Sequence, residues 1–334
     1  MNFGFKLFRH SKDMDKARDS IFKESEEPEG VEIKGYDFSK GIDFKEFLKS
    51  YASTGCQASN LGKAIDIAKR MKDSDTTIFL GYTSNMITSG VREAILHLVK
   101  NKLVHCLVTT AGGVEEDIIK TIMPFILGDF RLNGTELRNK GINRAGNILI
   151  PNSRYVEFEK IFMPLLHELH SEQKSGKIAT PSEICRRLGR LGDETSVLYW
   201  AAKNGIPVFC PGITDGSIGD MIFFFKSEHP DFKLDVSDDV VSLEEIVLDA
   251  KQTGAIILGG SLPKHHIMNA NMMREGTKFT IYINTATEGD GSDSGALPEE
   301  AKSWGKAAAD SDCVKVEGDA TIIFPLLVAG AFVD

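Results

Sequence analysis

Short runs of apolar and β-branched residues alternate along the chain with polar loops and stretches of helical periodicity. Six such runs end in Gly, Ser, Thr, Asn or Asp and lead into a helical pattern or the next loop: residues 76–82, 105–108, 206–209, 255–258, 279–283 and 314–316. Continuous apolar runs of this kind are typical of strands buried on both faces of a parallel sheet. The pattern therefore predicts a Rossmann-like α/β fold, with helices on both faces of a parallel sheet.

The helical stretches between the runs indicate where the strands end. We expect helices over residues 115–125 and 264–274, and a final apolar helix capped by Asp319. In open α/β sheets, ligands bind outside the carboxyl ends of the strands. The loops at these ends are rich in small residues and backbone donors, which favours a nucleotide or phosphate site. The same residues also form ordinary turns, so that alternative stays open at this point.

Residues 1–35 differ in composition from the rest of the chain. They are rich in Lys, Asp, Glu and Ser and include the run Glu24-Ser-Glu-Glu-Pro-Glu-Gly30. Such a segment predicts a mobile arm with one helix. Residues 36–334 contain all six apolar runs, so we expect a single large α/β domain there.

The net charge of the chain indicates which kinds of binding partner it favours. Of 334 residues, 48 are Asp or Glu and 39 are Lys or Arg, which gives a net charge of −9. This charge suits a polyamine or a basic protein loop better than a phosphate backbone. The chain shows no signal peptide and no apolar run of the roughly 20 residues that span a bilayer. We therefore expect no nucleic acid, no membrane and a cytoplasmic location. Five cysteines without CxxC spacing favour reduced thiols.

The segment 109–117 is the nearest substitute for a GxGxxG fingerprint. It reads Thr-Thr-Ala-Gly-Gly-Val-Glu-Glu-Asp, and its two glycines allow a ligand to approach the backbone. Glu115 and Glu116 would repel a bare pyrophosphate, but a carboxylate can accept hydrogen bonds from ribose hydroxyls. This segment is therefore a candidate dinucleotide site.

The segment 298–306 combines a carboxylate, an indole and a lysine. Glu300 and Trp304 are four residues apart and share a helix face. That pair suits an ammonium ligand, through charge pairing and cation–π attraction. Lys306 would point away from this face in a continuous helix, but Gly305 allows a turn that brings Lys306 to the same pocket. The alternative is an ordinary amphipathic helix with a surface lysine.

The triplet Lys264-His265-His266 opens the predicted helix over residues 264–274. The positive end of a helix dipole favours neutral imidazole, the form that a general base needs. Two adjacent residues of a helix cannot face one pocket, so we expect at most one of the two histidines to be catalytic. The alternative is that both are structural.

Two further motifs resemble metal-binding patterns but do not match them. His167 and His170 are three residues apart, whereas the HExxH pattern needs four, so we expect a solvated helix face there. The acidic loop 289–295 lacks the Glu that an EF-hand needs at its twelfth position, where Ala301 stands. We therefore expect no metal.

Longer motifs join these candidates. They are Gly81-Tyr-Thr-Ser-Asn85, Ser303-Trp-Gly-Lys306, and residues 109–117, 196–204, 215–224, 264–267 and 282–295, the last of which contains Gly-Ser-Asp-Ser-Gly. In this combination the chain resembles deoxyhypusine synthases from about Gly35 to its C-terminus. The N-terminal arm matches that family poorly.

The resemblance implies an NAD-dependent transferase of hypusine biosynthesis, a post-translational modification. In that family the aminobutyl group of spermidine moves to one lysine of the precursor of translation initiation factor 5A. NAD takes a hydride from spermidine, 1,3-diaminopropane leaves, and the butyl-imine fragment passes through an enzyme lysine to the substrate lysine, where NADH reduces it. The family forms homotetramers with sites shared across a dimer interface, and its N-terminal segment can cover the site entrance.

The resemblance also implies roles for residues at matching positions. Lys306 would be the imine-forming nucleophile, which must attack as the neutral amine, and His265 the base. Around spermidine, Trp304 would wall the channel, while the other implied residues are Asp220, Asp293 and Glu300 for its charged nitrogens and Tyr282 and Asn269 for its position. The residues implied for NAD are Ser84, Asn85, Thr110, Ala111, Gly112, Glu115, Glu116, Asp215, Gly259, Gly260, Thr285, Ala286, Asp290, Ser294, Asp319 and Ala320.

Two alternative functions are compatible with the same motifs. Homospermidine synthases of plants resemble deoxyhypusine synthases and keep the lysine, but they pass the aminobutyl group to putrescine. A weakly active paralogue could instead act as a regulatory partner. The presence of Lys306, His265 and Glu300 argues against the regulatory paralogue.

Overall fold

The structure is a computed structural model that describes residues 11–333, and the chain divides into two units between Ile33 and Lys34. The first unit contains helix α1 (Ser11–Ile21). All strands and the other helices lie in the second unit.

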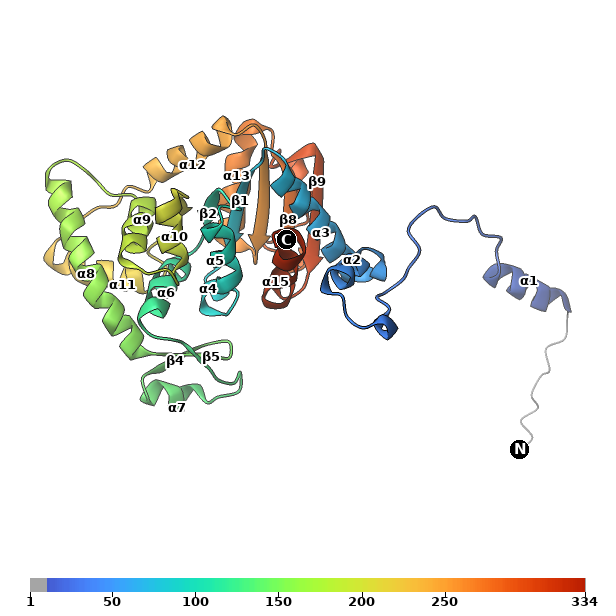
Figure 1. The fold of residues 1–334 in the computed structure, drawn as a ribbon, viewed down its shortest axis with the longest axis horizontal. Helices are drawn as coiled ribbons and strands as arrows, with labels where there is room; N and C mark the ends of the chain where they lie inside the picture. The colour runs from blue at the N-terminus through green and yellow to red at the C-terminus, as the bar shows by residue number, and fades with distance from the viewer. Residues whose placement is uncertain (1–10, 334) are drawn as a thin grey trace. The chain divides into compact units, whose positions relative to one another are not determined.

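Six parallel strands form the main sheet of the second unit (Figure 1). Their order is β6-β2-β1-β7-β8-β9, and neighbours pair in parallel throughout, with Leu80 aligned between Leu107 and Ile256. The bounds are β1 (Thr77–Tyr82), β2 (Cys106–Val108), β6 (Val208–Phe209), β7 (Thr253–Leu258), β8 (Thr277–Asn284) and β9 (Ala307–Glu317). Each strand overlaps with one of the six predicted runs, although β9 begins seven residues before its run, and the prediction of a parallel α/β fold is confirmed.

Helices connect these strands. They are α2 (Phe44–Thr54), α3 (Cys56–Asp73), α4 (Asn85–Thr88), α5 (Arg92–Lys100), α6 (Ala111–Ile122), α7 (Gly134–Asn139), α8 (Asn152–Lys174), α9 (Pro181–Leu191), α10 (Val197–Asn204), α11 (Ser217–Glu228), α12 (Ser237–Asp249), α13 (Ser261–Ala270), α14 (Pro298–Ser303) and α15 (Ala320–Ala331). Three short 3₁₀ segments cover Phe38–Lys40, Asn271–Arg274 and Glu288–Asp290. Between residues 11 and 333 we find no helix that is both long and apolar enough to cross a membrane.

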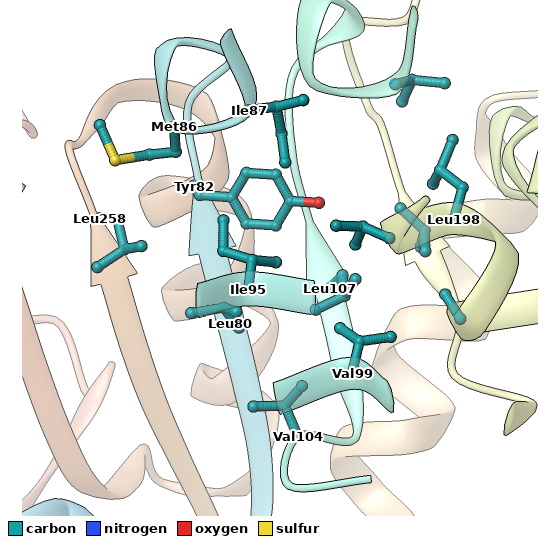
Figure 2. Close-up of a cluster of buried hydrophobic side chains, with 14 of the residues drawn as sticks. Leu80, Tyr82, Met86, Ile87, Ile95, Val99, Val104, Leu107, Leu198 and Leu258 are labelled. Atoms are coloured by element: carbon teal, nitrogen blue, oxygen red, sulfur yellow. The ribbon is translucent and has the colours of Figure 1, made fainter. Parts of the chain in front are cut away.

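The side chains of each strand alternate between two apolar cores. Leu80 and Tyr82 of β1 point into the larger core, which also holds α3, α5 and α15. Figure 2 shows the Tyr82 ring in this core, among aliphatic side chains. Phe79 of β1 and Ile257 of β7 point to the opposite face, where they pack with α12 and α13. Helices therefore cover both faces of the sheet, as predicted.

The strand order reverses its direction between β1 and β7. From β1 the chain adds β2 and β6 on one side, and then β7, β8 and β9 on the other. The loops after β1 and β7 meet here, because a Cβ on Gly259 would lie 2.9 Å from Thr83 Oγ1. Gly259 also has φ of +82°, a conformation that glycine adopts without strain. Such a reversal forms the crevice in which open α/β sheets bind their ligands.

Two helices begin earlier than the sequence pattern predicts. Helix α6 starts at Ala111, so Gly112 and Gly113 lie in its first turn, and it ends at Ile122. Helix α13 starts at Ser261, so Lys264-His265-His266 lie in its second turn and do not open it. The predictions were wrong because the first turns contain Gly112 and Gly113 in α6 and Ser261 and Pro263 in α13, which are residue types common in loops.

A second, antiparallel sheet was missed entirely. Its order is β3-β5-β4, with β3 (Ile126–Leu127), β4 (Ile142–Ala145) and β5 (Ile148–Pro151). These strands have two to four residues, and most of their side chains are exposed or half-buried. They therefore lack the long apolar run that identifies the main strands.

The expectation of a solvated face for both His167 and His170 is wrong for His170. His170 is only 5% exposed, and its Nε2 lies 3.0 Å from Asp231 Oδ2. The rings of Phe225 and His229 pack against it. The end of α11 and the loop after it cover this part of α8, while His167 is exposed.

The two edge strands of the main sheet differ in length and protection. Strand β6 has only two residues. At the other edge, α3 protects the carboxyl end of β9, because Asn60 Nδ2 donates to the Lys315 carbonyl at 3.1 Å and Gln57 Oε1 accepts from the Glu317 amide at 2.9 Å.

Asp117 ties two of the sequence motifs together. Its carboxylate is fully buried and accepts hydrogen bonds from Arg92 Nε at 2.7 Å and Ser196 Oγ at 2.6 Å. It also accepts from the amides of Val197 and Leu198 at 3.1 and 2.9 Å, which satisfies free N–H groups at the start of α10. The segments 109–117 and 196–204 therefore hold each other in place.

Replacing Asp117 by asparagine should lower the free energy of unfolding by about 3 kcal/mol, because Arg92 loses its buried counter-charge. Chemical denaturation of the purified protein would measure this loss. Asp66→Asn removes an exposed carboxylate 3.0 Å from Arg70, and it should cost less than about 0.5 kcal/mol. Equal losses in the two variants would contradict a special role of the buried pair.

Candidate active site

A turn after α14 brings Lys306 into a pocket with Glu300 and Trp304. Helix α14 ends at Ser303, and Gly305 has φ of +70°. The Lys306 Nζ lies 5.5 Å from the centroid of the Trp304 ring. All three side chains line the same pocket, so the predicted effect of Gly305 is confirmed.

His265 lies beside the Lys306 amine, although it is not among the residues that line the pocket. Its Nε2 lies 3.4 Å from Lys306 Nζ, within reach of proton transfer. His265 lies on the exposed side of α13, with Asn269 one turn further on. His266 is half-buried, and burial lowers its pKa. As expected for adjacent helical residues, only one of the two histidines meets Lys306.

One wall of the pocket is acidic. Asp293 and Glu300 line it, and Asp293 Oδ2 is buried without a hydrogen-bond partner among the described residues. Tyr282 of β8 also lines the pocket and is fully buried. A buried carboxylate oxygen without a partner is costly unless a ligand satisfies it. The pocket is therefore suited to a cation that carries N–H donors.

The residues predicted to bind a dinucleotide follow the carboxyl ends of the six parallel strands. They are Ser84 and Asn85 after β1, Thr110, Ala111 and Gly112 after β2, Asp215 after β6, Gly259 and Gly260 after β7, Thr285, Ala286, Asp290 and Ser294 after β8, and Asp319 and Ala320 after β9. Hydrogen bonds join neighbouring loops: the Ser84 amide donates to Thr110 Oγ1 at 3.0 Å, and the Ser261 amide donates to Ser294 Oγ at 2.8 Å.

Glycines allow these loops to pack closely. A Cβ on Gly112 would lie 2.7 Å from the Ser84 Cβ, and a Cβ on Gly260 would lie 2.5 Å from Ser294 Oγ. Thr110 precedes α6 without capping it through its side chain. The first amides of α6 are therefore placed as in helix N-termini that bind phosphate.

Glu115 and Glu116 contact the chain itself. Glu115 is 4% exposed, and its carboxylate accepts from the Ser217 and Ile218 amides at 3.2 and 2.8 Å, at the start of α11. Glu116 accepts a hydrogen bond from Thr88 Oγ1. Burial raises the pKa of both carboxyl groups, that of Glu116 to about 7.

The raised pKa of Glu116 predicts a pH-dependent stability. Its usual value is 4.5, so the folded chain binds this proton more tightly than the unfolded chain does. The free energy of unfolding should therefore fall as the pH rises from 4.5 to 7. Glu116→Gln should remove the part of this fall that Glu116 causes. Its free energy of unfolding should exceed that of the parent protein by about 3 kcal/mol at pH 8, with little difference near pH 4. Urea denaturation at both pH values would measure the free energies of unfolding. A difference between variant and parent that is the same at both pH values would contradict a raised pKa of Glu116.

Of the residues predicted to bind the polyamine, Asp220 and Asn269 do not line the Lys306 pocket. Asp220 is exposed on α11. Asp319 Oδ1 accepts from the Thr321 amide at 2.8 Å and caps α15, as predicted. Asp290 Oδ1 accepts from the Ser292 amide at 2.8 Å.

Two buried lysines beside the pocket were not predicted. Lys264 Nζ lies 4.3 Å from the centroid of the Tyr282 ring, and Lys315 points inward from β9. The sequence signal for Lys315 is a single charge inside the apolar run 314–316. Over residues 11–333, no group of three or more His, Cys, Asp and Glu side chains has an arrangement suited to a metal ion.

The fold and this pocket define an α/β enzyme with a lysine–histidine pair beside a crevice of glycine-rich loops. Residues 46–331 match the family model described as deoxyhypusine synthase. The chain belongs to the deoxyhypusine synthase family, and its members are transferases.

Individual relatives agree with this family. A probable deoxyhypusine synthase of Methanocaldococcus jannaschii is 53% identical over 92% of this chain and 98% of its own. Homospermidine synthase 1 of Senecio vernalis is 49% identical over 96% of this chain and 94% of its own. A crystal structure from Entamoeba histolytica, described as that of a deoxyhypusine synthase, is 32% identical over 90% of this chain and 96% of its own, with a TM-score of 0.66.

Proposed function

We propose that the chain transfers the aminobutyl group of spermidine to one lysine of the precursor of translation initiation factor 5A, with NAD as cofactor and Lys306 as carrier. The observation that carries this proposal is the 3.4 Å approach of Lys306 Nζ to His265 Nε2 in a pocket with an acidic wall. Such a pocket combines a nucleophile, a base and a binding surface for ammonium groups.

The strand-end loops fit NAD. Gly112 and Gly260 let the loops pack closely, so that a ligand at the sheet reversal would meet main-chain atoms there. The amides that begin α6 suit the pyrophosphate. Ser84, Asp290 and Ser294 would contribute polar groups from three loops. When bound, NAD would accept a hydride from the polyamine and return it to the product. Glu115 and Glu116 would have to exchange their present contacts to reach a ribose.

Lys306 and His265 account for the transfer itself. His265 takes a proton from the Lys306 ammonium, and the neutral amine attacks the oxidised carbon of the polyamine. The C–N bond to 1,3-diaminopropane breaks as the C=N bond to Lys306 forms, and the diamine leaves with the proton. The acceptor lysine then displaces Lys306 in the same way. His265 thus moves a proton in both directions.

The acidic wall accounts for polyamine binding. Asp293 Oδ2 has the free lone pairs that an ammonium group needs, and Glu300 adds a second charge. The Trp304 ring supplies a cation–π surface and is 62% exposed. Spermidine carries about three positive charges at neutral pH, because its amines have pKa values near that of lysine.

The site is proposed to be shared between copies of the chain in a homotetramer. Asp220 lies outside the Lys306 pocket, so a second copy would have to bring it to the substrate. Phe223 and Phe224 beside it are exposed, as is Trp304, and exposed aromatic residues favour an interface. Native mass spectrometry should give four chains per particle.

We also propose that residues 36–334 form the catalytic domain, that residues 1–35 form an arm, and that the protein acts in the cytoplasm. The unit boundary after Ile33 supports this division. Free thiols at all five cysteines support a reducing compartment.

One experiment separates the two acceptors. Unmodified initiation factor 5A is incubated with the protein, NAD and spermidine, and a parallel tube contains putrescine and no factor. One aminobutyl unit on a single lysine of the factor, found by mass spectrometry, would support the proposal. Homospermidine in the parallel tube with an unchanged factor would favour the second candidate, which the 49% identity to the Senecio vernalis enzyme supports.

A further inference from the structure

The loop between β8 and α14 carries much of the proposed site. It includes Asp293 on the acidic wall and Ser294, whose Oγ accepts from the Ser261 amide at 2.8 Å. Residues 287–292 of this loop are exposed. Its conformation therefore decides where the Asp293 carboxylate lies, and it needs support from the rest of the chain.

Two buried lysines bind this loop at four backbone carbonyls. Lys264 Nζ, from α13, donates to the Asp293 carbonyl and to the Ala296 carbonyl, the latter at 3.0 Å. Lys315 Nζ, from β9, donates to the carbonyls of Ala286 and Gly295 at 2.6 and 2.8 Å. The two ammonium groups thus hold both ends of the loop and the residues on either side of Ser294.

Burying these charges is costly. Lys264 is 2% exposed and Lys315 is 9% exposed. Removing an ammonium group from water costs several kcal/mol, and hydrogen bonds must offset that loss. Burial also lowers the pKa of Lys264 to about 8. The neighbouring Lys315 and Lys306 lower this pKa further, whereas Asp293 and Glu300 raise it. An apolar side chain would fill the space at lower cost, which favours a role in fixing the geometry of the loop.

We propose that Lys264 and Lys315 are positioning residues for polyamine binding, which hold the loop over residues 286–296 so that the Asp293 carboxylate stays in the Lys306 pocket. This inference rests on the proposed function of that pocket. Lys264 acts most directly, because its ammonium group binds the carbonyl of Asp293 itself and lies over the Tyr282 ring that lines the pocket. Lys315 acts through the neighbouring carbonyl of Gly295.

The test uses Lys264→Met and Lys315→Met, which keep the length of the side chain and remove its hydrogen bonds. Lys226→Met is the matched control, because Lys226 Nζ also binds two carbonyls, those of Pro230 and Phe232, in a loop without site residues. Hydrogen–deuterium exchange of residues 286–297 and the kinetics for spermidine and NAD are measured on the full chain. Circular dichroism checks that each variant is folded.

We expect exchange in residues 286–297 to become at least about tenfold faster in both site variants. The KM for spermidine should rise at least about tenfold, while the KM for NAD changes less than about threefold. The Lys226→Met control should match the parent protein in the exchange rate of residues 286–297 and in both KM values. Unchanged exchange, or faster exchange with an unchanged KM for spermidine, would overturn the proposal. Failure of the proposed function would show separately, as an inactive parent protein.

Discussion

Replacing Lys306 by arginine is expected to lower the rate of aminobutyl transfer by at least about a thousandfold. Arginine keeps the positive charge, but its guanidinium stays protonated and cannot attack carbon. His265, at 3.4 Å from the lysine amine, is too weak a base to take a proton from a guanidinium at that position. Activity should be measured together with borohydride trapping, which fixes an imine as a stable aminobutyl adduct.

The matched control for this variant is Lys302→Arg. Lys302 lies on α14, the short helix that precedes Lys306, and its amine lies 3.2 Å from Glu299 Oε2 outside the pocket. That variant should keep its activity and its adduct. An aminobutyl adduct on the Lys306→Arg protein would show that another residue is the nucleophile. Binding of NAD and spermidine should survive in both variants, which separates a lost reaction from a lost site.

The second large effect is expected for Asp293→Asn. Its Oδ2 is buried and lacks a partner in the described part of the chain, so an ammonium group would gain a charge-assisted hydrogen bond there. Losing such a bond corresponds to a rise of about 10- to 100-fold in the KM for spermidine. The affinity for NAD should change by less than about threefold, and calorimetric titration can measure it.

Glu299→Gln provides the control for Asp293→Asn. Glu299 lies next to Glu300 in the sequence, but its side chain is 81% exposed and does not line the pocket. Neither KM should change in this control. Equal losses of spermidine and NAD binding in Asp293→Asn would place Asp293 outside the polyamine site.

The main sheet could be predicted from the sequence because its strands are buried on both faces. Their apolar runs are continuous except in the first half of the edge strand β9, and the small polar residues after each run mark the carboxyl ends. The strands of the second sheet have only two to four residues, and Leu127 is largely exposed, so they leave no comparable pattern. The starts of α6 and α13 were placed too late because their first turns contain residues typical of loops, Gly112 and Gly113 in α6 and Ser261 and Pro263 in α13.

The pocket could be predicted only in part. The spacing of Glu300, Trp304 and Lys306 is local, and Gly305 shows where the helix must end. The pairing of Lys306 with His265 spans 41 positions in the chain, and it entered only through a resemblance to a known family. The carbonyls that Lys264 and Lys315 bind could not be predicted from the sequence, because any residue can supply a carbonyl.

The protected edges of the main sheet have a consequence for how copies of the chain can associate. A bare edge strand is a template on which a second molecule can add a strand, and uncontrolled addition of this kind leads to aggregation. Here one edge is too short to serve as a template, and amide side chains of α3 occupy backbone groups at the carboxyl end of the other. Addition of a strand from another molecule is therefore disfavoured at β6 and at the carboxyl end of β9. Contacts between copies of this chain at these two places would have to form through side chains of helices and loops.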